Sequence, residues 1–202
     1  MGIDELCALP VADLAAPDSA LFLWATFPQL PEALRLIEAW GFRYKSVAFV
    51  WLKKNKKADS WFYGLGFWTR GNAEICLLAT KGHPKRKAAN IHQFIISPIE
   101  AHSKKPDEVR EKIVALMGDL PRVELFARQS PPGWDVWGNE VKSTIPDFGL
   151  MEPPKNQRFC GERRNNGADG LRDKVSRGSQ AEFVTTSPEV KGAGKEADPC
   201  PM

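Results

Sequence analysis

The chain alternates between short apolar runs and stretches with helical periodicity. Three largely apolar runs, at residues 21–26, 46–51 and 75–79, predict strands, and the segment 122–127 (RVELFA) predicts another. Such runs are typical of strands that are buried on both faces, and residues 93–97 and 135–137 predict two shorter strands. Apolar residues recur at helical spacing over 28–40 and again after Pro106, and a glycine follows each stretch, as at many helix C-termini. This alternation predicts an α/β fold, with a mostly parallel sheet and helices on both faces.

A sheet of this kind determines where a ligand is expected. Open α/β sheets bind ligands in the crevice beyond the carboxyl ends of their strands. Candidate site residues are therefore those at or just after Trp24, Trp51 and Phe126, which end three of the predicted strands.

Composition divides the chain into two parts. All seven tryptophans and both tyrosines precede residue 144, and the last 59 residues contain only three phenylalanines as aromatics. A segment so poor in large apolar groups cannot bury enough surface to offset the entropy lost on ordering. The sequence therefore predicts a folded domain over 1–143 and a disordered tail over 144–202.

Positive charge is concentrated in the middle of the chain. The net charge is only +3, yet residues 53–87 contain nine basic and two acidic residues, and five aromatics fall within 61–68. Basic groups between aromatics suit phosphate neutralisation together with base stacking, whereas the alternative is a solvated loop with a few core aromatics. The predicted nucleic-acid contacts are Lys53, Lys54, Lys56, Lys57, Arg70, Lys85, Arg86 and Lys87.

Several common motifs are absent from the sequence. There is no GxGxxG after a strand, no P-loop, no HExxH and no GxSxG, and the four cysteines show no CxxC spacing. No apolar run approaches the ~18 residues of a membrane helix. Asp4 and Glu5 stand where a secretory signal carries basic residues. We therefore expect a cytoplasmic protein without a metal site or a membrane partner.

The remaining motifs resemble a known family. In chain order they are LFLWAT (21–26), VWLKKN (50–55), GFWTRGNAEICLLATKG (66–82), KPDE (105–108), RVELFAR (122–128) and GWDVWGNE (133–140). In this combination they look like the MT-A70 family of adenine N6-methyltransferases, over about residues 1–141. The resemblance implies a Rossmann-like methyltransferase fold and S-adenosylmethionine as the cofactor.

The resemblance also assigns site residues. It implies cofactor contacts at Lys105, Leu125, Phe126, Arg128, Asn139 and Glu140, and a substrate pocket at Trp24, Trp51 and Ser103. Taken without the family, Lys105 is a solvated residue before a helix, and the aromatic and leucine positions are ordinary core. An arginine just past a buried strand, such as Arg128, needs a polar partner in any case.

One element of the family pattern is not found. Relatives carry an Asp-Pro-Pro-Trp loop, whose Asp and a backbone carbonyl accept hydrogen bonds from the adenine amine, shortly before the stretch that starts here at Met1. It is absent from residues 1–20, and we regard the similar string at 152–155 (EPPK) as a coincidence. We expect a misassigned start, a fragment or a degenerate copy, that is, a domain lacking its N-terminal catalytic strand and loop, with little or no activity alone.

Two classes of function therefore remain open. The first is an S-adenosylmethionine-dependent N6-adenine methyltransferase of nucleic acid, with DNA preferred over RNA. The alternative is a non-catalytic nucleic-acid-binding paralogue or fragment that acts as a partner subunit. A small-molecule methyltransferase is disfavoured by the basic aromatic segment, and a homodimer or heterodimer is left open.

Overall fold

The computed structural model describes residues 1–66, 68–101, 104–145 and 148, and the backbone of 181–185. The helices are α1 (Ile3–Cys7), α2 (Val11–Leu14), α3 (Leu30–Ala39) and α4 (Glu108–Met117), with a 3₁₀ turn, η1, at Phe27–Gln29. The strands are β1 (Ser19–Ala25), β2 (Arg43–Lys54), β3 (Ala73–Lys81), β4 (Phe94–Pro98), β5 (Arg122–Leu125), β6 (Asp135–Trp137) and β7 (Ala181–Thr185).

The strands of the described residues form one sheet in the order β4-β2-β3-β1-β7-β5-β6. The strand pairings give β1, β2, β4, β5 and β6 one common direction, and β3 and β7 run against it. The expectation of a mostly parallel sheet is therefore only partly correct. Two of the pairings, β2 with β4 and β5 with β6, are parallel. The others are antiparallel, because β3 and β7 each lie between strands of the opposite direction.

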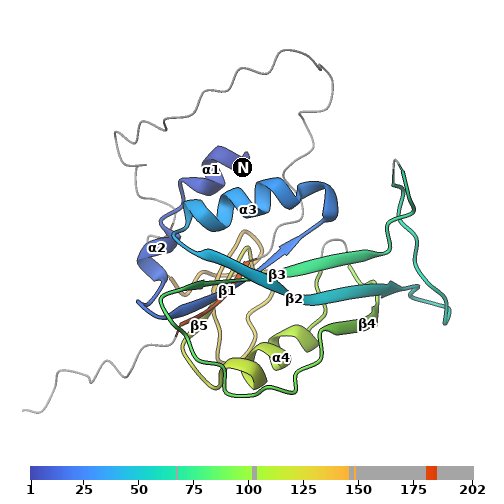
Figure 1. The fold of residues 1–202 in the computed structure, drawn as a ribbon. Coiled ribbons are helices and arrows are strands. Elements are labelled where there is room, and N and C mark those ends of the chain that lie inside the picture. Colours follow the sequence, from blue (N-terminus) through green and yellow to red (C-terminus); the bar gives the residue numbers. More distant parts are fainter. Residues whose placement is uncertain (67, 102–103, 146–147, 149–180, 186–202) are drawn as a thin grey trace, which may run out of the picture.

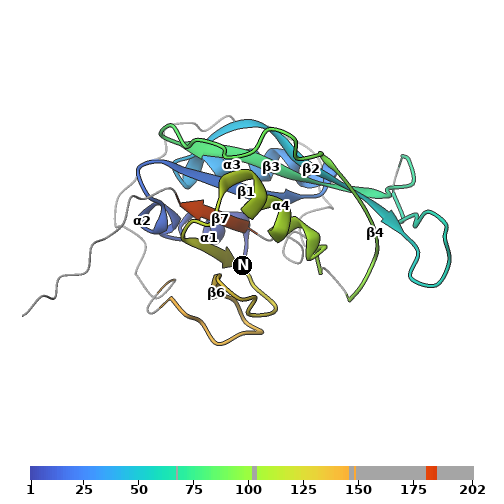
Figure 2. The same cartoon turned by 90° about the horizontal axis from the view of Figure 1, so that it is seen from below.

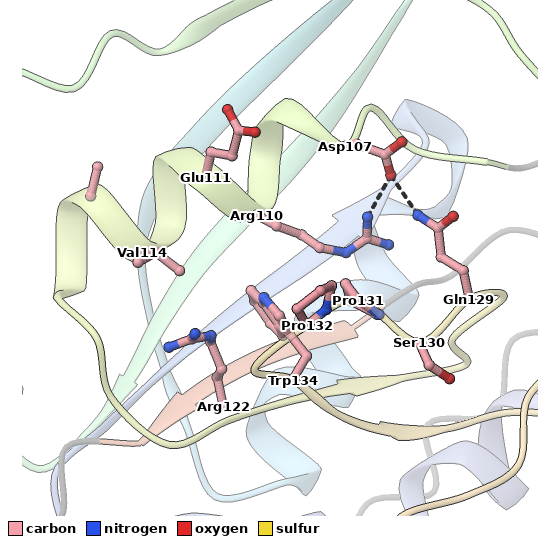
Figure 3. A pocket seen from close by; sticks show the side chains of 11 residues that line it. Asp107, Arg110, Glu111, Val114, Arg122, Gln129, Ser130, Pro131, Pro132 and Trp134 are labelled. Carbon is pink, nitrogen blue, oxygen red and sulfur yellow. Dashed lines mark hydrogen bonds and ion pairs between the residues drawn. The ribbon is translucent and has the colours of Figure 1, made fainter.

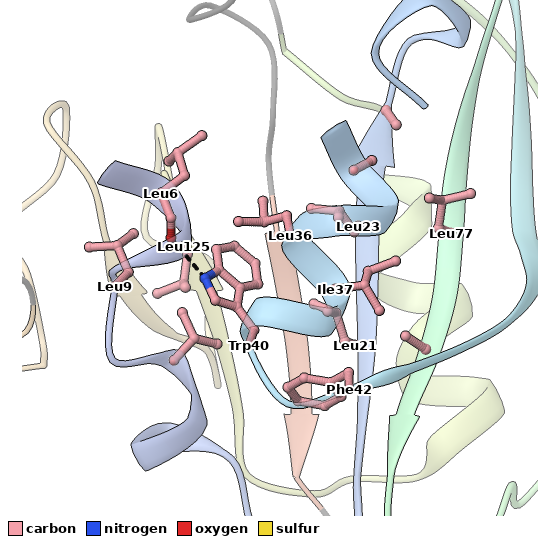
Figure 4. Close-up of a cluster of buried hydrophobic side chains, with 14 of the residues drawn as sticks. Leu6, Leu9, Leu21, Leu23, Leu36, Ile37, Trp40, Phe42, Leu77 and Leu125 are labelled. Carbon is pink, nitrogen blue, oxygen red and sulfur yellow. Dashed lines mark hydrogen bonds between the residues drawn. The ribbon is translucent and has the colours of Figure 1, made fainter. Parts of the chain in front are cut away.

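Helices cover both faces of this sheet, as predicted (Figure 1). On one face, α1, α2 and α3 pack against Leu21, Leu23 and Leu77, as Figure 4 shows for α1 and α3. The indole N–H of the buried Trp40 donates to the carbonyl of Leu6 at 2.9 Å and joins α3 to α1. On the other face, Val109, Ile113 and Met117 of α4 pack against aromatic residues of β1 and β2. Full burial of each aliphatic side chain contributes roughly 1.5–3 kcal/mol, so both layers stabilise the sheet.

Every element that periodicity predicted is present in the structure, although some of the bounds differ. Each of the six predicted strands and both predicted helices is present. β2 extends beyond the predicted residues 46–51 at both ends, to Arg43 and Lys54. The helices α1 and α2 were not predicted, because five and four residues are too few to show a 3.6-residue period.

The boundary of the folded part differs from the prediction. Thr144 and Val136 exchange two hydrogen bonds of 2.9 Å, and Phe148 is buried edge-on against Trp137. Residues 181–185 form β7 between β1 and β5 (Figure 2). The prediction of a disordered tail was based on the average composition of 144–202. Average composition does not detect a five-residue strand, which needs little apolar surface of its own when it is paired on both sides. The rest of the predicted tail lies outside the described residues. No helix in the described ranges has the length and apolar character to cross a bilayer.

Candidate active site

Three strands bring chemically distinctive residues to one edge of the sheet. β1 and β2 both end there, and β3 starts there because it runs in the opposite direction. The register places Trp51 of β2 opposite Glu74 of β3, and Trp24 of β1 opposite Cys76. This edge is the carboxyl end of the parallel strands, where the sequence predicted a ligand site.

Glu74 is the centre of a buried ion-pair cluster at this edge. One carboxylate oxygen accepts a hydrogen bond from Lys53 Nζ at 2.5 Å, and the other accepts one from Lys105 Nζ. The Lys105 side chain is 5% exposed and that of Glu74 12% exposed. A lysine this buried must be paired, because an isolated ammonium pays a large desolvation penalty. The structure therefore contradicts the alternative in which Lys105 is a solvated residue.

The cluster keeps its carboxylate ionised. Burial raises the pKa of the Glu74 carboxyl, but the charges of Lys105 and Lys53 and the hydrogen bonds from both outweigh burial, and the pKa lies below its ordinary value. Both lysines also face tryptophan rings: Lys105 Nζ lies 5.7 Å from the Trp24 ring centre and Lys53 Nζ 5.0 Å from that of Trp51.

The two tryptophans lie in the core beneath this cluster. Their rings meet edge to face at 6.5 Å, and neither is more than 4% exposed. Trp51 Nε1 donates to the carbonyl of Ser97 at 3.2 Å, whereas the buried Trp24 Nε1 has no acceptor among the described residues. A substrate role for these two residues therefore stays a prediction. The third predicted pocket residue, Ser103, lies outside the described residues.

The second half of the site follows β5. Phe126 has φ +60°, a left-handed conformation that costs a bulky residue about 1–3 kcal/mol and often marks a functional turn. Its ring packs edge-on against Trp137 at 5.3 Å. Gly138 lies so close to the turn that a Cβ there would stand 2.3 Å from the Ala127 carbonyl oxygen. Only glycine allows this approach, which places Glu140 beside Arg128.

Arg128 and Glu140 form a two-point ion pair. Arg128 Nε and an Nη nitrogen lie 2.9 and 2.7 Å from one Glu140 oxygen. The hydrogen bond from Arg128 holds the pKa of the Glu140 carboxyl below its ordinary value. Leu125 is fully buried and Asn139 is exposed beside the pair.

A pocket of about 180 Å³ joins the two halves of the site. Its lining includes Lys105 from one half, Arg128 and Glu140 from the other, and Gln129 between them. The structure thus brings together three of the six predicted cofactor contacts in one cavity. The carboxylate suits ribose hydroxyls, and the cationic and amide groups suit a carboxylate or ring nitrogens. The volume is below the 300 Å³ or so of ligand pockets in general, so it fits part of a nucleoside-sized molecule.

A larger cavity of about 770 Å³ lies beside this pocket, between α4 and the loop after β5 (Figure 3). Arg110 and Gln129 line both cavities. The Asp107 carboxylate accepts hydrogen bonds from Arg110 at 2.5 Å and from Gln129 Nε2 at 2.6 Å. Arg110 in turn holds the fully buried Glu124 of β5. These bonds attach the start of α4 to β5 and to the loop that follows it.

The predicted nucleic-acid residues do not form one surface. Lys56, Lys57 and Arg70 are exposed on the connection between β2 and β3, which projects beyond the sheet (Figure 1). Trp68 and Tyr63 on the same connection are 98% and 58% exposed. We call residues 55–72 the basic arm. Lys53 belongs instead to the buried cluster, and Lys54 pairs with Asp59.

The other three predicted contacts lie at the far end of β3. Lys85, Arg86 and Lys87 follow Lys81, which pairs with Ser19 at the start of β1. Nine residues of β3 separate the two groups, about 30 Å at 3.3 Å per residue. Residues 83–87 are named the distal loop. The basic residues are close in sequence, which suggested a single nucleic-acid-binding patch. In the structure the extended strand β3 separates them into two groups.

Sequence reasoning missed Glu74. In the sequence it is only one of two acidic residues in a basic region, although it is the residue that pairs with both lysines of the site. The sequence did contain a sign of its role. Glu74 directly precedes the apolar residues 75–79 (ICLLA), and a charged residue at the start of a buried strand must lie at the edge of the sheet or have an oppositely charged partner.

The fold and the site together define the class of this protein. It is an α/β domain with a polar pocket at the carboxyl edge of its sheet. A family model for MT-A70 matches residues 1–140, and the chain belongs to the MT-A70 family. It is 37% identical over 158 residues to a type II methyltransferase, M.MunI, from Mycoplasma sp; the match covers 76% of this chain and 65% of that protein.

Two other relatives are more distant. The chain is 31% identical over 145 residues to an N(6)-adenosine-methyltransferase MT-A70-like protein of Arabidopsis thaliana. It is also 31% identical over 154 residues to the N(6)-adenine-specific methyltransferase METTL4 of Homo sapiens. These matches cover 70% and 68% of the chain but only 21% and 32% of the relatives. The chain therefore spans less than two thirds of the length of each of these relatives.

Proposed function

We propose that this chain is the donor-binding and nucleic-acid-binding part of an S-adenosylmethionine-dependent N6-adenine methyltransferase, with DNA as its substrate in preference to RNA. The observation that carries the proposal is the pocket in which Lys105, Arg128 and Glu140 meet at the carboxyl edge of the sheet. The family and the activities in the relatives' names support the reaction. The higher identity to a bacterial type II methyltransferase than to an adenosine methyltransferase supports DNA.

The lining residues have separate roles in this proposal. Glu140 accepts hydrogen bonds from ribose hydroxyls, and Asn139 and Arg128 hold the polar ends of the donor. S-adenosylmethionine, when bound, supplies a methyl group that its sulfonium already activates. Lys105 is fixed by Glu74, so its position does not depend on the ligand, and such preorganisation reduces the entropy lost at the reacting centre.

Adenine is the harder partner in this reaction. Its exocyclic amine is a weak nucleophile, because the nitrogen lone pair is delocalised into the ring. The base must leave its stack, and acceptors must take hydrogen bonds from the amine as it attacks. Glu74 is a buried carboxylate at this edge of the sheet, but both of its oxygens are engaged by lysines. We therefore propose that an acceptor outside the described residues completes the active site.

Donor binding tests the proposal independently of catalysis. In calorimetric titrations with S-adenosylhomocysteine, Arg128→Ala should weaken binding by about 1.5–3 kcal/mol, because a charge-assisted hydrogen bond is lost. The control is Arg35→Ala, which removes a similar arginine from an exposed pair with Asp4 on the other face. A well-folded chain that binds no donor analogue would refute the proposal.

The alternative is a non-catalytic subunit that binds nucleic acid. It is favoured by the Arg128–Glu140 ion pair, because these two proposed donor contacts are bonded to each other. The two functions differ in one measurement. A catalytic part should bind the donor analogue more tightly when adenine-containing DNA is present, whereas a binding subunit should hold DNA with the same affinity with or without the donor.

A further inference from the structure

The larger cavity between α4 and the loop after β5 has no part in the proposed function. Its volume of about 770 Å³ is within the range of roughly 300–1,000 Å³ that is typical of small-molecule sites. Val114 and Ala115 of α4 line one side of it, and Pro131, Pro132 and Trp134 line the other (Figure 3). The cavity therefore offers apolar walls on two separate elements, between which an apolar group can be buried.

Arg122, the first residue of β5, lies beside Trp134 at one end of this cavity (Figure 3). Its guanidinium carbon is 5.6 Å from the Trp134 ring centre, and Nη1 donates to Asp119 at 2.7 Å and to the Leu120 carbonyl at 2.9 Å. Gly133 has φ +75°, and a Cβ there would stand 2.7 Å from Arg122 Nη2, so a larger residue would displace the guanidinium. These contacts fix the position of the guanidinium independently of any ligand.

The hydrogen bonding of Arg122 is incomplete on one side. Both of its acceptors are bonded to Nη1. The side chain is only 10% exposed, and its buried Nε has no acceptor among the described residues. Nε and Nη2 together form the edge of a guanidinium that binds both oxygens of a carboxylate. Because a buried donor without an acceptor is destabilising, this arrangement favours a ligand that supplies one.

The other charged groups of the lining determine how much negative charge the cavity accepts. Arg110 has its partners within the protein, since Nε and Nη2 donate to the buried Glu124 and Nη1 donates to Asp107. Two carboxylates, those of Asp107 and Glu111, also line the cavity. One guanidinium edge beside two carboxylates suits a ligand with a single negative charge. It disfavours a phosphate ester, which carries nearly two.

We propose that this cavity is a second small-molecule site, and that its ligand is a monocarboxylate with an apolar body. The carboxylate bonds to Nε and Nη2 of Arg122, and the body packs between Val114 and Trp134, where the burial of apolar surface adds affinity. The site does not depend on the proposed function, because the donor contacts Lys105 and Glu140 line the smaller pocket and not this cavity.

Calorimetric titration of the full chain with 2-naphthoate tests the site without any methyl transfer. The neutral 2-naphthamide has nearly the same shape and should bind roughly 10- to 150-fold more weakly, because it cannot make charge-assisted bonds to the guanidinium. Acetate lacks the apolar body, and 2-naphthyl phosphate carries more charge, so both should also bind more weakly. An affinity for any of these three compounds that equals or exceeds that for 2-naphthoate, or no binding of 2-naphthoate, would overturn the proposal.

Two substitutions assign the probe to this cavity. Arg122→Lys keeps the positive charge but loses the planar edge, and should weaken 2-naphthoate binding about 10-fold or more. Ala115→Glu, at an exposed position of α4, adds a carboxylate to the lining and should also weaken binding, so the test remains valid if Arg122→Lys fails to fold. The matched control is Ala39→Glu, at an exposed position of α3, which should leave binding unchanged. A folded lining variant that binds 2-naphthoate as the wild type does would contradict the proposal.

A competition experiment separates this site from the donor pocket. With S-adenosylhomocysteine at saturation, the chain should still bind 2-naphthoate. Complete competition would mean that the cavity holds the carboxylate end of the donor, and the inference of a second site would then be wrong. Binding of 2-naphthoate by a chain that binds no donor analogue would instead count against the proposed function alone.

Discussion

Basic residues lie near both ends of β3, but the two ends have different physical roles. At the site end, Glu74 lies between Lys53 and Lys105, each of which faces a tryptophan ring, and the basic arm projects beyond this cluster. At the distal end, Lys81 donates to the carbonyls of Ala12 and Ala15, and so attaches the strand to the end of α2. Both ends are rich in lysine. The comparison shows that the function of a lysine here depends on burial and on its acceptor.

The largest effect is expected at Glu74. Glu74→Ala leaves two buried ammonium groups without their carboxylate, and removal of one partner of a buried pair costs about 3–5 kcal/mol. Urea unfolding followed by tryptophan fluorescence measures this loss. The control is Asp59→Ala, which removes the exposed partner of Lys54 and should not change the midpoint. Equal midpoints for the two variants would show that burial does not distinguish these pairs.

The same carboxylate should make the site end sensitive to acid. Because the folded pKa of Glu74 is lowered, its contribution to stability is present above its unfolded pKa and is lost as the pH falls through the folded value. Glu74→Gln lacks this titration. Its free energy of unfolding should therefore change less than that of the wild type as the pH is lowered through that range. Parallel curves for the two proteins would contradict the assignment.

The exposed aromatics of the basic arm should contribute to nucleic-acid affinity. Trp68 is 98% exposed, and loss of one base–aromatic stack costs about 1–3 kcal/mol. Trp68→Ala should thus weaken binding of single-stranded DNA by roughly 5- to 150-fold in fluorescence anisotropy. Tyr44→Ala removes a half-exposed aromatic at the distal end of β2 and serves as the control. Equal losses would mean that the arm is not the contact surface.

The smallest effect is expected from the distal loop. Replacement of Lys56, Lys57 and Arg70 by serine should lower the slope of log affinity against log salt by about 2–3, since up to three phosphate contacts are lost. The charge-matched replacement of Lys85, Arg86 and Lys87 should change that slope by less than one. If the two triple variants lose the same slope, both ends of β3 contact nucleic acid, as the sequence predicted.

Periodicity was sufficient for the predicted elements and for the edge of the sheet at which the candidate pocket lies. The run at 21–26 and the helical stretch from Pro28 have flanking turn residues and one consistent period, so local sequence determines them. The KPDE, ELFAR and WGNE motifs likewise located Lys105, Arg128 and Glu140, which meet in one pocket. Trp24 and Trp51 lie at the edge of the sheet where the sequence placed them, but a pattern of apolar residues does not distinguish a core tryptophan from one that lines a pocket.

The sequence by itself thus determined the α/β elements, the family and the residues that follow β5. Only the tertiary structure decided which charges are paired. Glu74 meets Lys105 from 31 residues away, and no local pattern encodes a contact between a strand and the segment before a helix. The structure also decided that the basic region is divided and that residues 181–185 complete the sheet. The physical reason is the same in each case. Strand pairing and ion pairing depend on which chain segments lie side by side in space, whereas periodicity reports only on neighbours along the chain.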